Sequence, residues 1–414
     1  MPYRLLKFGL EKEYSEPRMF RSPERLRESY EVVIIGGGGH GLAAAHYLAE
    51  EHGIRDVAVL EQRYIGHGGT GRNTSIIRSN YLTEEGARFY QFSVDLYRDL
   101  SRQLDFNLFY SERGHFTLAH TPASLRTQRW RAEVNKHLDI DSEVVGPEFI
   151  KKTIPEIDLS CGGHQPPIVG ALYHPPGAIA RHDAVAWAYA RGADQGGAEI
   201  HQQTKVTDIE VADGQVTGVH TNRGFIKTRK VLSAVAGWTT AVQQMVGLRT
   251  PLVVHPLQAL VTEPFKPWLD AIVVSASLHT YISQSSRGEL VSGASLDPYE
   301  LISMRSTLDF AEGLAGHMID LFPFLGQVKV LRQWAGLCDM TPDFSPLMGT
   351  TPLRGFYIDA GWGTWGFKAS PVCGYTMAHT VANDEDHPLI RPFNLSRFGD
   401  FDLVGEKGAA SVGH

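Results

Sequence analysis

The chain has 414 residues, enough for two or three domains, and 39 Lys and Arg against 46 Asp and Glu give a net charge of -7. That balance argues against nucleic-acid binding, and 43% hydrophobic with 21% charged residues argues against a mainly disordered chain. Three widely spaced cysteines, no zinc spacing, no signal peptide and no membrane-length apolar run predict a cytoplasmic protein with no metal and no membrane contact.

Residues 1–30 mix arginine, lysine and glutamate, which predicts an extended N-terminal arm with a little helix. Two interpretations stay open, a loose tail and an arm that packs on another subunit. The second would cover five apolar side chains that are otherwise exposed: Leu5, Leu6, Phe8, Met19 and Phe20.

The first strong pattern is a βαβ unit. A β-branched run at 31–35 predicts a buried strand, good helix formers with an apolar face occupy 42–51, and 57–61 predicts a second strand. Between the first strand and the helix lies a glycine cluster at 36–41.

Later patterns alternate between helix and strand. The sequence predicts helices at 84–105, 121–137, from 183 onward, at 301–321 and at 370–383, with a loop across the glycines and prolines of 161–180. It predicts strands at 204–212, 215–221, 229–236 and 355–360, and antiparallel strands within 250–300.

These elements predict an α/β chain in which a discontinuous dinucleotide-binding domain accompanies a second domain with a mixed sheet. The expected bounds are 1–30 for the arm, 31–80, 165–240 and 335–395 for the dinucleotide domain, 81–164 and 241–334 for the substrate domain, and 396–414 for a C-terminal tail.

The glycine cluster has the spacing of a dinucleotide fingerprint. Gly36, Gly38 and Gly41 allow a tight turn and close approach of a pyrophosphate, and the following helix N-terminus favours its negative charge. Glu61 ends the second strand and is placed to accept hydrogen bonds from ribose hydroxyls. The motif does not separate FAD from NAD.

Two further segments, 66–78 and 361–368, separate the two cofactors. Together they resemble the D-amino-acid-oxidase-like flavoproteins, over nearly all of 31–395. The resemblance implies a Rossmann-like FAD-binding domain plus a substrate domain with a mixed, largely antiparallel sheet.

Five stretches resemble more closely the β subunits of heterotetrameric sarcosine oxidases: 37–42, 72–81, 180–187, 255–260 and 373–380. This resemblance implies that sarcosine loses a hydride to non-covalent FAD and that electrons pass to a histidine-bound FMN, where oxygen becomes hydrogen peroxide. It also implies α, γ and δ partner subunits, with tetrahydrofolate on a partner taking the one-carbon unit. The products are glycine and either 5,10-methylenetetrahydrofolate or formaldehyde.

Three residues are catalytic candidates. Arg78 stands where relatives hold a carboxylate-binding arginine, whose guanidinium grips a carboxylate with two parallel hydrogen bonds. Lys368 is a second cation, for the carboxylate or for the anionic reduced flavin, and Thr364 lies in the same glycine-rich turn. Each also has a plain structural interpretation, as an ordinary surface or turn residue.

The expected cofactor-binding residues come from four parts of the chain. Backbone N–H groups of the 361–366 turn are expected to point at the flavin C2 carbonyl, and Arg72 at a flavin phosphate. The full set is Gly36, Gly38, Gly39, His40, Gly41, Glu61, Gln62, Thr70, Arg72, Asn73, Thr74, Val206, Gly361, Gly363, Gly366 and Lys368. Cys338 is expected to be a packing cysteine and not a flavin attachment point.

His182 is the preferred site for covalent FMN, and His174 is the alternative. His182 is expected to start a helix, where Asp183 would hydrogen-bond the ring and Arg181 would stabilise electron-rich flavin. Two other functions stay open: a single-flavin amino-acid oxidase or dehydrogenase of the glycine oxidase or dimethylglycine dehydrogenase kind, and a non-catalytic flavin-binding assembly subunit.

Overall fold

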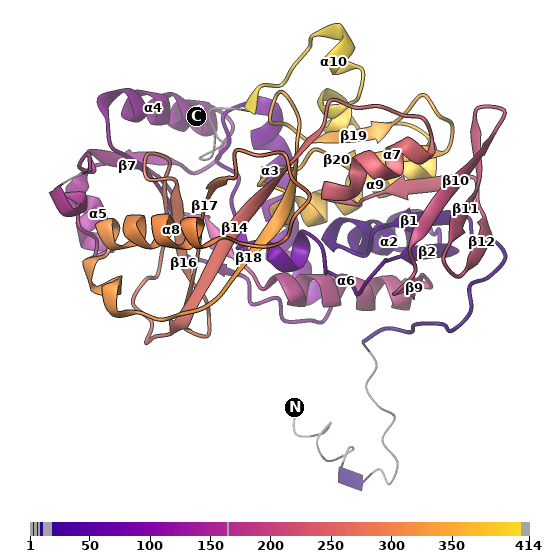
Figure 1. Ribbon diagram of the computed structural model, residues 1–414, viewed down its shortest axis with the longest axis horizontal. Helices are drawn as coiled ribbons and strands as arrows, with labels where there is room; N and C mark the ends of the chain where they lie inside the picture. Colours follow the sequence, from indigo (N-terminus) through magenta and orange to yellow (C-terminus); the bar gives the residue numbers. More distant parts are fainter. Residues whose placement is uncertain (1–2, 4–5, 7–8, 11–18, 164, 407–414) are drawn as a thin grey trace.

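The computed structural model describes residues 3, 6, 9–10, 19–163 and 165–406. Figure 1 shows two lobes, each built on its own β-sheet, joined by the long strands β14 (Val253–Pro264) and β18 (Val330–Met340). Within the described part of the chain, none of the helices combines the length and the apolarity needed to cross a membrane.

The first lobe contains a six-stranded sheet whose neighbours are parallel except for one antiparallel pair at its edge. In spatial order its strands are β19 (Leu347–Thr350), β20 (Phe356–Ala360), β13 (Lys230–Ser233), β1 (Val32–Ile35), β2 (Val57–Leu60) and β9 (Glu199–His201). Three distant segments of the chain therefore build one sheet.

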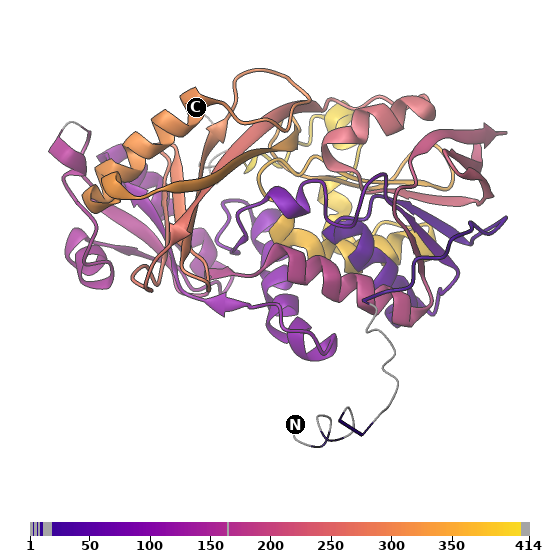
Figure 2. The ribbon, with the colours of Figure 1, turned by 60° about the horizontal axis from the view of Figure 1, so that its bottom comes forward.

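Strand β1 is apolar at every position because both faces of this sheet are covered. Val32 and Ile34 pack into a core shared with helices, whereas Val33 and Ile35 pack under a three-stranded meander. The helices are α2 (Gly39–His52), α6 (His182–Gly196) and α9 (Ser370–Asn383), with α2 against both others (Figure 2). On the meander side lie β10 (Val206–Ala212), β11 (Gln215–Thr221), β12 (Gly224–Lys227) and α7 (Thr239–Met245).

The second lobe contains an eight-stranded sheet that is antiparallel except where β15 pairs with β5. Its order is β18, β14, β17 (Glu289–Leu296), β16 (Thr280–Gln284), β15 (Ile272–Ser275), β5 (His115–Ala119), β7 (Gly170–His174) and β6 (Glu143–Val145). The helices of this lobe are α4 (Pro122–His137), α5 (Pro147–Thr153) and α8 (Leu308–Leu321). The expected fold class, a Rossmann-like domain with a mixed, largely antiparallel second sheet, is confirmed.

Two element predictions were wrong. The stretch 161–180 is not all loop, because β7 lies between its two proline pairs and the short β8 (Ala178–Ile179) follows the second pair. Strand β7 pairs with β5 and β6, and β8 pairs with β3 (Ile76–Ile77) and β4 (Ser111–Glu112). The helix expected at 301–321 begins only at Leu308, where the Thr307 hydroxyl accepts the Phe310 N–H. The Thr307 N–H donates to Gln258 on β14, so tertiary contacts hold the residues before it extended.

The domain bounds stay a proposal, and strand pairing suggests two adjustments. Strand β7 belongs to the eight-stranded sheet although it lies inside 165–240. Helix α3 (Glu84–Gln103) lies inside 81–164 but buries its apolar face in the core of the first lobe.

The N-terminal arm meets the body at Phe20, which packs against the first-lobe core and so needs no partner subunit to cover it. Leu6 and Met19 are exposed, while Leu5 and Phe8 lie outside the described residues.

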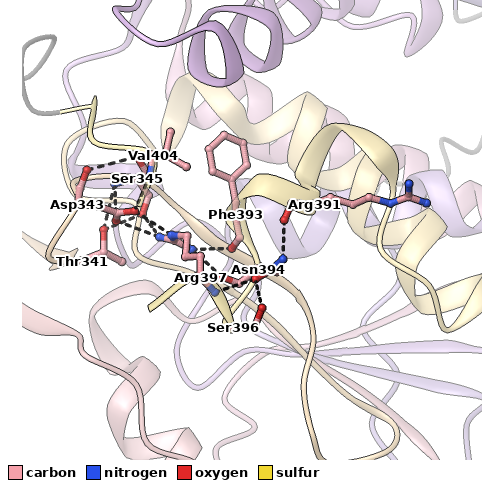
Figure 3. A network of polar contacts seen from close by, with 9 residues as sticks. All are labelled: Thr341, Asp343, Ser345, Arg391, Phe393, Asn394, Ser396, Arg397 and Val404. Atoms are coloured by element: carbon pink, nitrogen blue, oxygen red, sulfur yellow. Dashed lines mark hydrogen bonds and ion pairs between the residues drawn. The ribbon is translucent and has the colours of Figure 1, made fainter. Parts of the chain in front are cut away.

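The described part of the expected C-terminal tail, 396–406, is anchored. Arg397 of α10 (Arg397–Asp400) forms a buried two-point ion pair with Asp343, with N–O distances of 2.8 and 3.0 Å (Figure 3). The Val404 N–H donates to the same carboxylate, and Glu406 accepts the N–H groups of Leu82 and Thr83. The segment is therefore bound to the loop that follows Arg78.

Candidate active site

The turn after β1 is possible only with glycine. Gly36 has φ +111°, and a Cβ there would lie 2.2 Å from the Ala234 carbonyl oxygen. A Cβ on Gly41 would lie 2.1 Å from the Gly36 carbonyl oxygen. The N-cap residue of α2, Gly38, has no side chain with which to cap the helix. The Gly39 N–H is accepted by Thr70, and the remaining N–H groups of the first turn and the positive dipole end face the cavity side of the turn. Both features suit an anionic group held close to the backbone.

Glu61 follows β2 and lies beside this turn. Its carboxylate accepts the Gly37 N–H at 3.0 Å and the Arg63 N–H at 2.8 Å. Burial raises the pKa of Glu61 more than these two hydrogen bonds lower it. The carboxylate is fixed by backbone donors and still lines the adjoining cavity, where a hydroxyl donor can reach it.

One cavity runs from Glu61, past the glycine turn, to Arg78 and Lys368 between the two sheets. Of the predicted site residues, Gly41, Gly361, His174 and His182 do not line it. Those that do are Gly36, Gly38, Gly39, His40, Glu61, Gln62, Thr70, Arg72, Asn73, Thr74, Arg78, Val206, Gly363, Thr364, Gly366 and Lys368. The fold therefore brings residues from four separate parts of the sequence to one surface.

The loop at residues 70–75 lines the cavity, and hydrogen bonds fix it to neighbouring segments. Thr70 accepts the Gly39 N–H at 2.9 Å, Asn73 accepts the Ser75 N–H at 2.5 Å, and Trp334 donates its indole N–H to the Arg72 carbonyl at 2.8 Å. The Arg72 guanidinium donates to the Gly68 carbonyl and forms no ion pair with any described residue. Burial lowers the pKa of Arg72, as expected for a cation awaiting an anionic partner.

Two basic side chains, Arg78 and Lys368, lie at the second-lobe end of the cavity. Arg78 is 6% exposed, donates to the Asn80 side chain at 2.9 Å, and lies over the Tyr81 ring. Lys368 is 7% exposed, and its pKa is well below the usual value because of burial and the nearby Arg78 charge. Arg78 supplies the permanent positive charge for a carboxylate, and a carboxylate bound beside Lys368 would raise its pKa and favour its protonated form.

His115 also lines this end, and no sequence pattern predicts it as a site residue. It begins β5, is 2% exposed, and its Nδ1 atom has no hydrogen-bond partner among the described residues. Burial and the charge of Arg78 lower its pKa well below the usual value, so the ring is neutral. A single histidine in an apolar strand has no spacing that would mark it as a site residue.

The expectation that the N–H groups of the 361–366 turn point at a flavin carbonyl does not hold for Gly361 and Gly363. The Gly361 N–H donates to the Asp339 carboxylate at 2.6 Å, and the Gly363 N–H donates to the Asp339 carbonyl at 2.9 Å. These two N–H groups therefore hold the turn to β18 and do not point at a flavin carbonyl. Burial raises the pKa of Asp339 to about 7.

The residues present fit a bound dinucleotide. They supply a glycine cradle, a helix N-terminus without an N-cap side chain, a carboxylate beyond β2 and an arginine, Arg72, that has no ion pair with a described residue, all along one cavity. Residues 31–380 match the family described as FAD dependent oxidoreductase.

The chain belongs to this FAD-dependent oxidoreductase family.

Several relatives are similar over nearly the whole chain. The sarcosine oxidase subunit beta of an Arthrobacter species is 44% identical, covering 96% of this chain and 97% of its own. The protein of the same name from Rhodobacter capsulatus is 40% identical, and the alignment covers 96% of this chain and 95% of that protein. The crystal structure of L-proline dehydrogenase from P. horikoshii superimposes with a TM-score of 0.85 at 28% identity, covering 91% of this chain and all of that one.

In this oxidoreductase the two candidate histidines have different surroundings. His174 is fully buried; its ring interacts with the Asp141 carbonyl and with Ser79, and burial lowers its pKa to about 3. His182 begins α6, as predicted, and is partly exposed.

The expected bond from Asp183 to the His182 ring is wrong, because Asp183 instead binds Arg181 and the Ala184 N–H. The Nδ1 atom of His182 has no partner among the described residues.

Cys338 lines the cavity, and burial raises the pKa of its thiol well above the usual value. A protonated thiol is a poor nucleophile. Attachment of a flavin at this cysteine is therefore disfavoured.

Proposed function

We propose that this chain is the β subunit of a sarcosine oxidase and carries out the oxidative demethylation of sarcosine. The observation that carries the proposal is the pair Arg78 and Lys368, buried together at one end of a cavity whose other end fits a dinucleotide. The names of the relatives at 40% and 44% identity supply the substrate. Sarcosine, oxygen and water would give glycine, formaldehyde and hydrogen peroxide.

In the proposed site, Arg78 and Lys368 bind the substrate carboxylate and thereby fix the methyl group and nitrogen over the flavin. FAD supplies the hydride acceptor when bound. The low pKa of His115 keeps that ring neutral, and the cations around it favour the neutral amine form of the substrate. Thr364, in the turn before Lys368, lines the same end and offers a hydroxyl for hydrogen bonding.

The proposal includes a second flavin, FMN, bound covalently to His182. An imidazole must be neutral and accessible to bond to a flavin. His182 is partly exposed as a residue and burial lowers its pKa, which supports this choice, although its unpartnered Nδ1 atom is itself buried, so the bond would form at Nε2 or after a rotation of the ring. His174 is fully buried and its ring nitrogens contact Asp141 and Ser79, which argues against His174 as the attachment site for FMN. Because His182 lies outside the FAD cavity, FMN would sit at a boundary with a partner subunit, among the α, γ and δ subunits proposed here. Tetrahydrofolate on a partner would accept the one-carbon unit.

Anaerobic addition of sarcosine tests the reaction. We expect loss of the oxidised flavin absorbance in the assembled enzyme, and unchanged absorbance would contradict any catalytic role. A single-flavin oxidase or dehydrogenase stays the alternative, because the similar L-proline dehydrogenase structure also spans this fold. The mass of the denatured chain separates the two: an adduct of FMN size supports the two-flavin proposal.

Peptide mapping tests the attachment site. We expect the fluorescent flavopeptide to contain His182, and His182→Asn protein to lack covalent flavin, whereas a matched His174→Asn variant that folds should retain it. FMN on the peptide containing His174 would reverse the assignment.

A further inference from the structure

His40 lies in the first turn of α2, and both of its ring nitrogens are hydrogen-bonded. Nδ1 is 3.0 Å from a carboxylate oxygen of Asp359, and Nε2 is 2.7 Å from the Gly366 carbonyl oxygen. The carboxylate also accepts the indole N–H of Trp362 at 2.5 Å. Asp359 is 2% exposed, so this contact is shielded from water.

Both partners of the ring are acceptors. A neutral imidazole donates only one hydrogen bond, so satisfying both partners requires a proton on each nitrogen. Burial alone would lower the pKa of His40, but the Asp359 charge and the two hydrogen bonds raise it overall. The geometry and the electrostatics therefore agree on a buried imidazolium.

The Gly366 carbonyl is the first of three successive carbonyls held by side chains. The Tyr97 hydroxyl donates to the Phe367 carbonyl at 2.9 Å, and the Ser93 hydroxyl donates to the Lys368 carbonyl at 2.6 Å. The first donor comes from α2 and the other two come from α3. The backbone that carries Lys368 is thus fixed from the dinucleotide side by one charged donor and from the helix α3 by two neutral ones.

We propose that His40 is a positioning residue, a permanently protonated imidazole that holds the turn carrying Lys368 and so couples the dinucleotide end of the cavity to the carboxylate end. This inference rests on the proposed role of Lys368 in substrate binding.

A metal ion is a poorer explanation of the same cluster. His40, Asp359 and Cys373 have atoms within 4.8 Å of one another, a spacing that a cation could use. However, both ring nitrogens are already hydrogen-bonded, and burial raises the pKa of the Cys373 thiol well above the usual value. A protonated thiol is not a metal ligand.

A double-mutant cycle tests the proposal, using His40→Gln, Lys368→Met and the double variant in the FAD-loaded enzyme. The measurement is the sarcosine dissociation constant from anaerobic titration, with FAD content as a control. We expect His40→Gln to weaken sarcosine binding about tenfold, the size of one lost charge-assisted hydrogen bond. The double variant should bind no more weakly than Lys368→Met alone, because His40 acts through Lys368.

The outcomes separate the inference from the function on which it rests. If Lys368→Met leaves sarcosine affinity unchanged, the proposed role of Lys368 and this inference both fail. If Lys368→Met weakens binding but the two effects add, the function stands and His40 has only a general structural role. Tyr97→Phe is the matched control, since it removes a neutral donor to the same turn and should have a smaller effect.

The protonation state of the His40 ring can be measured in the wild-type enzyme, so this test does not require any variant to bind FAD. Solid-state 15N NMR of the histidine-labelled wild-type enzyme should contain one imidazolium whose two N–H signals persist to pH 9, and His40→Gln identifies it. A neutral His40 ring at pH 7 would overturn the proposal.

Discussion

The two ends of the cavity are built in opposite ways. At the dinucleotide end, Gly36, Gly41 and Glu61 lie within one βαβ unit, and backbone sterics require the two glycines. At the carboxylate end, Arg78 and Lys368 come from distant segments of the chain, after β3 and just before α9, and meet only in the folded structure. A local motif thus fixes cofactor binding, whereas substrate binding depends on long-range support.

The largest effect is expected from removing that long-range support. Arg397→Met leaves the Asp343 carboxylate buried without its partner, which should lower the free energy of unfolding by about 3–5 kcal/mol. Urea denaturation measures this loss. Arg391→Met is the matched control, because its ion pair with Glu385 is exposed and should contribute less than about 1 kcal/mol. Equal losses in the two variants would contradict the importance of burial.

Arg78→Lys tests the carboxylate end directly. Lysine cannot form two parallel hydrogen bonds to a carboxylate, so sarcosine binding should weaken by about 1.5–3 kcal/mol, or roughly ten- to a hundred-fold. FAD should stay bound, since the dinucleotide end is untouched. Anaerobic titration with sarcosine and with a carboxylate inhibitor measures both; unchanged affinities would show that Arg78 has another role.

The contrast between the ends also explains what the sequence could predict. The glycine turn, Glu61 and the fold class follow from local rules, because a φ of +111° at Gly36 leaves no other residue possible. His115 of the second lobe lines the cavity only after the two lobes pack, and the donors His40, Ser93 and Tyr97 reach their carbonyls only when α2 and α3 pack against the turn at 366–368. Asp183 failed as a partner for His182 because the adjacent Arg181 competes for its carboxylate.

Glu61→Gln tests the dinucleotide end. The variant keeps one oxygen acceptor for the turn but loses the charge that strengthens hydrogen bonds from ribose hydroxyls, so FAD affinity should fall about tenfold. Covalent FMN should be unaffected, since FMN lacks the adenosine half. Denaturing the protein and extracting the flavin measures both amounts, because FAD is released and covalent FMN stays with the protein. Equal loss of the two flavins would indicate misfolding and not a ribose contact.

The smallest effect concerns Asp339, which holds the turn between the two ends. Its pKa of about 7 lies above the value in an unfolded chain, so the native state binds the extra proton and its contribution to stability is lost as the pH rises through 7. Asn cannot ionise, so Asp339→Asn should gain stability relative to wild type by on the order of 1 kcal/mol between pH 6 and pH 8. Urea denaturation of both proteins at these two pH values, at one FAD concentration, measures the difference. A difference that stays constant with pH would mean that Asp339 is ionised throughout, and that the Gly361 and Trp362 N–H groups alone stabilise its charge.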